Sequence, residues 1–126
     1  MKPIAQLKTR IILLDLGRNP AFDDQDVRSL AAVYNGCGPA WSPAWARREL
    51  TRRFAMFEPA FLIHDWDFAY ADKTCEEFNR VNRRLLKNCR KLASVGPWWL
   101  RPVLYAYAQI LYWSVSSRGG WEAYCA

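Results

Sequence analysis

The apolar positions of the chain recur with a helical period, and no segment has a persuasive two-residue alternation of a strand. The most regular stretch is TCEEFNRVNRRLLKNCRKL, residues 74–92. Thr74 followed three residues later by Glu77 is a capping box, which predicts that a new helix begins there. We therefore expect a mainly α protein. The apolar stripe of this helix consists of Phe78, Val81, Leu85, Cys89 and Leu92.

Upstream, NPAFDDQDVRSLAAVYNGCGP, residues 19–39, predicts a capped helix. Asp23 or Asp24 can serve as its N-cap, and Gly36 is expected to end it. The turn-rich loop NGCGPAWSP follows, and AWARRELTRRF, residues 44–54, predicts a short helix. The apolar face of the first of these helices is expected to contain Val27, Leu30, Ala31 and Tyr34.

Two more helices are predicted on either side of the capping box. One should begin near Pro59, because proline suits the first helical position. The last should run from Pro102 to about Ser117 and end at Gly119-Gly120, after SVGPWW has interrupted the chain. Its apolar part is too short to span a bilayer. On the helix that begins near Pro59, one face should carry Phe61, His64, Asp65 and Phe68.

Length and charge narrow the choice of partners. The 126 residues fit one domain, and the net charge of +6 points to an anionic partner: phospholipid, nucleic acid or an acidic protein. The chain is also rich in aromatic residues, with seven Trp, six Tyr and six Phe. Such residues fill cores but also favour membrane interfaces. We expect the four tyrosine and tryptophan side chains of the last helix to lie in the hydrophobic core. The four are Tyr105, Tyr107, Tyr112 and Trp113. Trp98 and Trp99, beside Arg101, could instead lie at a membrane interface.

The N-terminal segment does not resemble a signal peptide, because its apolar part, residues 11–14, is short and Asp15 interrupts it. Synthesis in the cytoplasm is therefore expected, and the cysteines are expected to be reduced. They show neither a CxxC pair nor a zinc-binding spacing, so we assign them to packing. They are Cys37, Cys75, Cys89 and Cys125.

His64 is the one histidine of the sequence. Its distance along the chain from Asn82 indicates whether the two side chains can meet. On one continuous helix the two residues would lie roughly 27 Å apart. If the chain instead reverses before Thr74, His64 is ten positions before this turn and Asn82 eight positions after it. Asn82 also falls within the apolar stripe of its helix. We therefore expect the two side chains to meet between antiparallel helices and to share a hydrogen bond.

The segments HDWDFAYAD, residues 64–72, and NGCGPAW, residues 35–41, resemble the phospholipase A2 superfamily. The likeness is greater to the small prokaryotic, phage and parvoviral members than to the venom and pancreatic enzymes, and it covers mainly residues 35–91. It implies a glycine-rich calcium loop followed by a His-Asp helix, which packs antiparallel against a second helix. Asn82, in VNRRLL, stands where the family often has an aspartate.

The resemblance implies a calcium-dependent hydrolase that cleaves the sn-2 ester of phospholipids at a membrane surface, which the charge predicts to be anionic. His64 matches the general base that activates water, and Asn82 matches the residue that orients it. Asp65 matches the carboxylate ligand of Ca²⁺, and the loop ligands match the carbonyls of Gly36, Gly38 and Ala40. The chemistry is sensible, because a neutral imidazole can accept a proton from water near pH 7. Ca²⁺ also prefers oxygen ligands.

Two other functions stay open at this stage. The chain could be an inactive relative, a structural or accessory protein of a phage or secretion particle, in which His64 is a satisfied core histidine. It could also be a basic nucleic-acid-binding domain. That reading is disfavoured, since the basic stripe of residues 80–91 lacks interleaved aromatics and is expected to be a solvated face. Asp67 and Asp72 are likewise expected to be solvated or helix-end charges, and the oligomeric state is left open.

Overall fold

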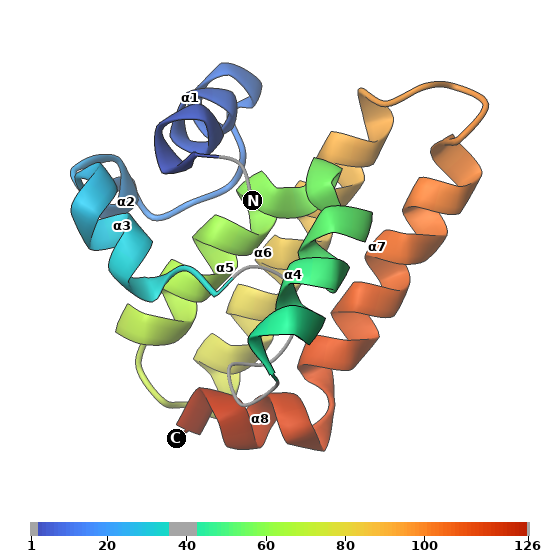
Figure 1. The fold of residues 1–126 in the computed structure, drawn as a ribbon. Coiled ribbons are helices and arrows are strands. Elements are labelled where there is room, and N and C mark those ends of the chain that lie inside the picture. Colours follow the sequence, from blue (N-terminus) through green and yellow to red (C-terminus); the bar gives the residue numbers. More distant parts are fainter. Residues whose placement is uncertain (1–2, 36–42, 126) are drawn as a thin grey trace.

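The computed structural model describes residues 3–35 and 43–125, which are drawn as ribbon in Figure 1. Helices dominate these ranges and no strand occurs in them, so the predicted mainly α class is confirmed. The elements are α1 (Ile4–Leu14), α2 (Pro20–Asp23), α3 (Val27–Val33), α4 (Ala44–Arg53), a short 3-10 helix (Ala55–Phe57), α5 (Glu58–Tyr70), α6 (Cys75–Ser94), α7 (Arg101–Ser116) and α8 (Arg118–Cys125).

A hairpin of α5 and α6 forms the centre of the molecule. The chain leaves α5 at Tyr70 and enters α6 at Cys75, and the two helices run back alongside each other (Figure 1). Thr74 is the N-cap of α6, and its hydroxyl oxygen accepts a hydrogen bond from the Glu77 backbone N–H at 3.1 Å. The predicted start of α6 is therefore confirmed. Its predicted apolar stripe is buried at all five positions.

Helix α5 is surrounded on several sides. It packs against α1, α3 and α6, and residues 58–64 are all buried. A helix that is apolar nearly all round suits such a central place. Its predicted start near Pro59 is confirmed, because Glu58 is the first residue of the helix. Helix α4 also lies where the sequence predicts it, on the near side of the hairpin in Figure 1.

The helix predicted for residues 19–39 is wrong in its details. The structure has two short helices instead, and their N-caps are Asn19 and Asp26 rather than Asp23 or Asp24. Asp26 is the N-cap of α3, because its carboxylate accepts a hydrogen bond from the Ser29 backbone N–H at 2.7 Å. Of the predicted apolar face, Leu30 is buried and Tyr34 is half-buried, whereas the other two side chains are exposed. These exposed residues are Val27 and Ala31.

The helix predicted from Pro102 to about Ser117 is confirmed as α7 (Arg101–Ser116), but the residues predicted to end it are wrong. Helix α7 ends at Ser116, but the pair Gly119-Gly120 does not stop the chain; it lies inside α8. A Cβ on Gly120 would lie 1.9 Å from the carbonyl oxygen of Val115. Glycine is therefore needed here for a close approach between α8 and the end of α7 rather than for a turn.

Several side chains predicted to be core are exposed. Helix α7 presents Tyr105, Tyr107 and Trp113 at the surface, since its buried side is limited to Leu104 and Ala108. The assignment of the thiols to packing holds for Cys89 and is wrong for two others, which lie on the surface at helix ends. They are Cys75 and Cys125. Cys37 lies outside the described residues.

The N-terminal segment forms α1, which the sequence pattern did not lead us to expect. Its apolar side buries Leu7 and Ile11 against the core, and Asp15 ends it in the left-handed conformation with φ 49°. Across the part of the chain that the structure describes, no helix combines the length and the apolarity that a membrane span requires.

Candidate functional site

His64 lies on the side of α5 that faces α6, with 7% of its surface exposed. Its Nε2 atom is 2.9 Å from Oδ1 of Asn82, which is itself buried on α6. The contact predicted from the distances to Thr74 is therefore confirmed. The turn at residues 71–74 brings the two residues to the same height along the paired helices. The apolar stripes of both helices direct the two side chains toward each other.

A third helix fixes the direction of the Asn82 amide. Its Nδ2 donates a hydrogen bond to the carbonyl oxygen of Val115 at 3.2 Å. Val115 is in the last turn of α7, where carbonyls lack an intrahelical N–H partner. Because a carbonyl can only accept, the Asn82 nitrogen must face Val115 and the Asn82 oxygen must face His64. No sequence signal identified Val115, since it acts through its backbone.

Burial keeps the imidazole neutral. Desolvation lowers the pKa of His64 to about 4, although the Asn82 oxygen opposes this by accepting a hydrogen bond. A neutral imidazole carries one proton, and the Asn82 oxygen requires it on Nε2. The Nδ1 atom consequently keeps its lone pair and is the basic atom of the ring. The Phe68 ring, whose centroid is 4.2 Å from that of His64, further excludes water on one side.

Asp65, the neighbour of His64, lies where the glycine-rich loop begins. Its Oδ2 accepts a hydrogen bond from the backbone N–H of Asn35 at 2.7 Å. The preceding residue is tied to the same helix, because the Tyr34 hydroxyl donates to Oε1 of buried Glu58 at 2.9 Å. Two contacts thus bring the start of the loop to α5. The sequence had indicated neither Glu58 nor this tether.

The predicted loop ligands, Gly36, Gly38 and Ala40, lie outside the described residues. Within the ranges that the structure describes, no group of three or more His, Cys, Asp or Glu side chains could hold a metal ion. A calcium site at this position would depend on Asp65 together with backbone oxygens. Such a donor set suits Ca²⁺, which takes carboxylate and carbonyl oxygens. The position of Asp65 beside the entry to the loop is compatible with it.

Asp67 is not the solvated charge that the sequence predicted. It is buried and forms an ion pair with Arg84 of α6, with both carboxylate oxygens 3.2 Å from Nη1. Burial raises the pKa of Asp67, and the Arg84 guanidinium opposes that rise. The pair links α5 to α6 beside the site. Asp72, in contrast, is exposed as predicted.

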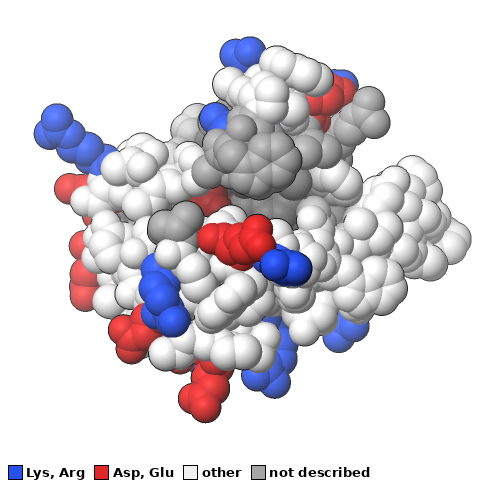
Figure 2. Space-filling view, turned by 90° about the horizontal axis from the view of Figure 1, so that it is seen from below, with Lys and Arg blue, Asp and Glu red and all other residues white. Residues whose placement is uncertain are grey.

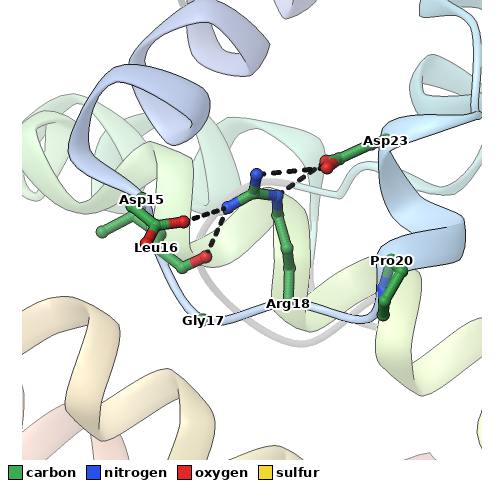
Figure 3. A pocket seen from close by; sticks show the side chains of 6 residues that line it. All are labelled: Asp15, Leu16, Gly17, Arg18, Pro20 and Asp23. Atoms are coloured by element: carbon green, nitrogen blue, oxygen red, sulfur yellow. Dashed lines mark hydrogen bonds and ion pairs between the residues drawn. The ribbon is translucent and has the colours of Figure 1, made fainter.

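An open pocket of about 300 Å³ lies away from His64, where the chain passes from α1 to α2 (Figure 3). Arg18 lies along it, and its guanidinium binds Asp23, Asp15 and the Leu16 carbonyl. The hydrogen bond and charge of Asp23 raise the pKa of Arg18, and Arg18 in turn lowers that of Asp23. These contacts use the guanidinium to join α1 to α2, so the pocket does not offer it to an anionic ligand.

The face of the molecule seen in Figure 2 carries charges of both signs, scattered among uncharged residues. It shows no continuous basic stripe such as a nucleic-acid backbone would follow. No protein-family model, curated protein or solved structure matches the chain.

Proposed function

We propose that the protein is a calcium-dependent hydrolase of the phospholipase A2 type, which cleaves the sn-2 ester of phospholipids. The observation that carries the proposal is the arrangement of His64. Its Nε2 atom is bound to Asn82, so Nδ1 is the atom that accepts a proton from the attacking water. The lowered pKa keeps this atom unprotonated throughout the neutral range.

Asn82 is a positioning residue in this proposal. Its oxygen holds the ring in one tautomer, and its own orientation is fixed by the Val115 carbonyl. The imidazolium that forms as water is deprotonated gains less from an amide than it would gain from a carboxylate. We therefore expect a slow enzyme.

Asp65 and the carbonyls of Gly36, Gly38 and Ala40 would hold the calcium ion. When bound, Ca²⁺ would polarise the ester carbonyl and stabilise the oxyanion of the intermediate. The support for this assignment is the hydrogen bond from Asn35 to Asp65, which brings the carboxylate to the start of the loop.

One observation favours a second candidate. His64 is nearly inaccessible. Neither it nor Asp65 lines the pocket beside Arg18 or a second, smaller pocket of about 170 Å³ beside Trp66. A structural or accessory protein of a phage or secretion particle, which retains the fold without activity, would have such a histidine. The nucleic-acid alternative has less support, because the visible charge is mixed (Figure 2).

The test measures calcium-dependent release of fatty acid from vesicles of neutral and of anionic phospholipid. Replacing His64 by Gln should reduce the rate by about 10²–10⁴-fold, the usual contribution of a general base. Asp65→Asn should abolish the calcium dependence, whereas Asp72→Asn, which removes an exposed carboxylate a few residues away, should leave it intact. Circular dichroism verifies that each variant is folded.

Two outcomes would contradict the proposal, the first by rejecting the enzyme and the second by rejecting His64 as its base. A well-folded parent that releases no fatty acid from either vesicle supports the accessory protein. Undiminished release by His64→Gln places the base elsewhere. Calorimetry separates the metal from the chemistry, because Asp65→Asn should lose calcium binding while Asp72→Asn retains it.

A further inference from the structure

Helix α7 presents an apolar face that no other element of the described residues covers. Its buried side, Leu104 and Ala108, packs against α6, and the helix forms the outer edge of the molecule on the right of Figure 1. The opposite side is apolar at successive turns, and Trp98 in the preceding turn continues it, with 76% of its surface exposed. We call this surface the α7 face; its members are Trp98, Trp99, Val103, Ile110 and Trp113.

The stretch of sequence that contains this face carries basic residues and no acidic ones. Residues 78–121 contain no Asp or Glu and eight Arg or Lys. Three of these form ion pairs with acids: Arg80 with Glu77, Arg84 with Asp67 and Arg118 with Glu122. The remaining five form no ion pair within the described residues. They are Arg83, Lys87, Arg90, Lys91 and Arg101.

Two of these cations lie close to the α7 face. Arg101 is exposed at the first position of α7, two residues after Trp99. Arg90 reaches across from α6, where its Nη2 donates to Oε1 of Gln109 at 3.3 Å. In Figure 2 the lobe on the side where α7 lies in Figure 1 is almost entirely uncharged. The surface therefore combines an apolar centre with cations at its margin.

We propose that the α7 face docks on the surface of an anionic phospholipid membrane. Exposed tryptophans favour the boundary between headgroups and acyl chains, because the ring is apolar and the indole N–H is polar. An apolar helix side of this kind lies in the plane of the interface, and anionic headgroups attract its Arg and Lys residues. Helix α7 is too short and too closely packed on α6 to insert across the bilayer.

A second copy of the chain is the other occupant to consider, since the spacing of Trp99, Val103, Ile110 and Trp113 would suit helix pairing. The charge argues against it. Paired helices draw on acidic and basic flanking residues for salt bridges, and this stretch has no acid to offer. Two such surfaces placed together would repel each other, whereas an anionic lipid surface neutralises the same charges.

The docking surface and the candidate site share α7, because Val115 of this helix holds Asn82. The biological meaning of the inference rests on the proposed phospholipid hydrolase, but docking itself requires no hydrolysis. It can therefore be measured with ether-linked phospholipids, which lack the ester, in the presence of a calcium chelator.

The experiment is cosedimentation of the full chain with vesicles of ether-linked phosphatidylcholine, with and without ether-linked phosphatidylglycerol. We expect binding to the anionic vesicles that weakens as salt rises. The double variant Ile110→Ser/Trp113→Ser should lower the partition coefficient by about tenfold or more, because both apolar side chains leave the interface. Its control is Leu13→Ser, which removes an even more exposed apolar side chain on α1 and should change binding by less than about twofold.

A second pair of substitutions, Trp98→Ser/Trp99→Ser, lies in the turn before α7 and tests the same surface without touching the helix. Unchanged binding in both double variants, or equal binding to both vesicles, would overturn the proposal. So would a dimer in sedimentation that Ile110→Ser/Trp113→Ser converts to a monomer. Hydrolysis of a dispersed short-chain phospholipid separates the two proposals: activity without vesicle binding rejects docking alone, and vesicle binding without activity rejects the hydrolase alone.

Discussion

His64 and Asn82 are joined through Nε2 and Oδ1, at 2.9 Å, across two helices that run in opposite directions. The Asn82 amide also donates to the Val115 carbonyl, so α5, α6 and α7 are connected by one short line of hydrogen bonds. The tautomer of the histidine is consequently determined by the end of a helix that lies more than thirty residues further along the chain. The predictions below test this connection and the packing around it.

The Asn82→Asp variant should raise the pKa of His64. A carboxylate beside Nε2 favours the imidazolium, whereas in the parent burial lowers the pKa to about 4 against the opposing hydrogen bond of Asn82. The variant should also hydrolyse phospholipid faster if the proposed function is correct. Because the chain has one histidine, an NMR titration of the imidazole protons reports its pKa without ambiguity.

Asn79→Asp is the control for this titration, since it adds the same charge at an exposed position on α6. The pKa of His64 should remain near that of the parent. An equal rise in both variants would mean that the effect is general charge rather than the contact with Asn82.

Acid should destabilise the protein through His64. Its pKa is about 4 in the folded state against 6.5 in the unfolded chain, so between these values the unfolded chain binds the additional proton. The free energy of unfolding therefore falls as the pH is lowered from 6.5, and the loss is complete below pH 4. When complete, this loss in the free energy of unfolding amounts to about 3 kcal/mol. Urea unfolding of the parent and of His64→Gln at several pH values measures the difference.

The variant lacks the titrating imidazole, so the difference in unfolding free energy between the parent and His64→Gln should vary with pH across this window. Curves that stay parallel from pH 7 to pH 4 would contradict the prediction. Effects of other acids cancel in this comparison, because both proteins retain them.

Gly120→Ala should disturb the end of α7. The new Cβ would lie 1.9 Å from the Val115 oxygen, so α8 or the last turn of α7 must move. We expect a loss of about 2 kcal/mol or more in stability, as for other steric clashes in a packed structure. Val115 also holds Asn82, so the titration of His64 should change as well.

Gly119→Ala is the matched control. Its Cβ would meet the Ser117 hydroxyl at 3.8 Å, which is ordinary contact. Alanine also suits a helix better than glycine, so stability should rise by about 0.5–1 kcal/mol. Similar unfolding midpoints for the two alanine variants in thermal denaturation would refute the close approach.

Asp67→Ala should cost about 2 kcal/mol, because it leaves the Arg84 guanidinium in a half-buried place without its carboxylate. The double variant Asp67→Leu/Arg84→Met removes both charges and should recover most of this loss. Chemical denaturation measures each free energy of unfolding. Glu122→Ala breaks an exposed pair with Arg118 and serves as the control, with little change expected.

The sequence by itself determined the helical class and much of the central hairpin. The capping box of Thr74 and Glu77 and the regular stripe from Phe78 to Leu92 are local signals, which act over a few residues and need no distant partner. Together they place His64 and Asn82 at one level, and that was enough to predict their contact. The wrong N-cap at Asp23 or Asp24 shows the limit of such signals, because three nearby acidic residues compete and Asp26 accepts the hydrogen bond from a backbone N–H of the helix.

The tertiary structure alone decided what surrounds that contact. Asp67 is buried because Arg84 lies opposite it, and Tyr105 and Trp113 of α7 are exposed because no other element of the described residues covers them. Position 120 requires glycine for a tertiary reason as well, because α8 approaches the Val115 carbonyl too closely for a Cβ atom. Burial and backbone contacts depend on which elements meet in space. When two segments are distant in the chain, no local sequence pattern indicates that they will be in contact. The low pKa of His64 is therefore a property of the packed molecule, although the residue itself stands plainly in the sequence.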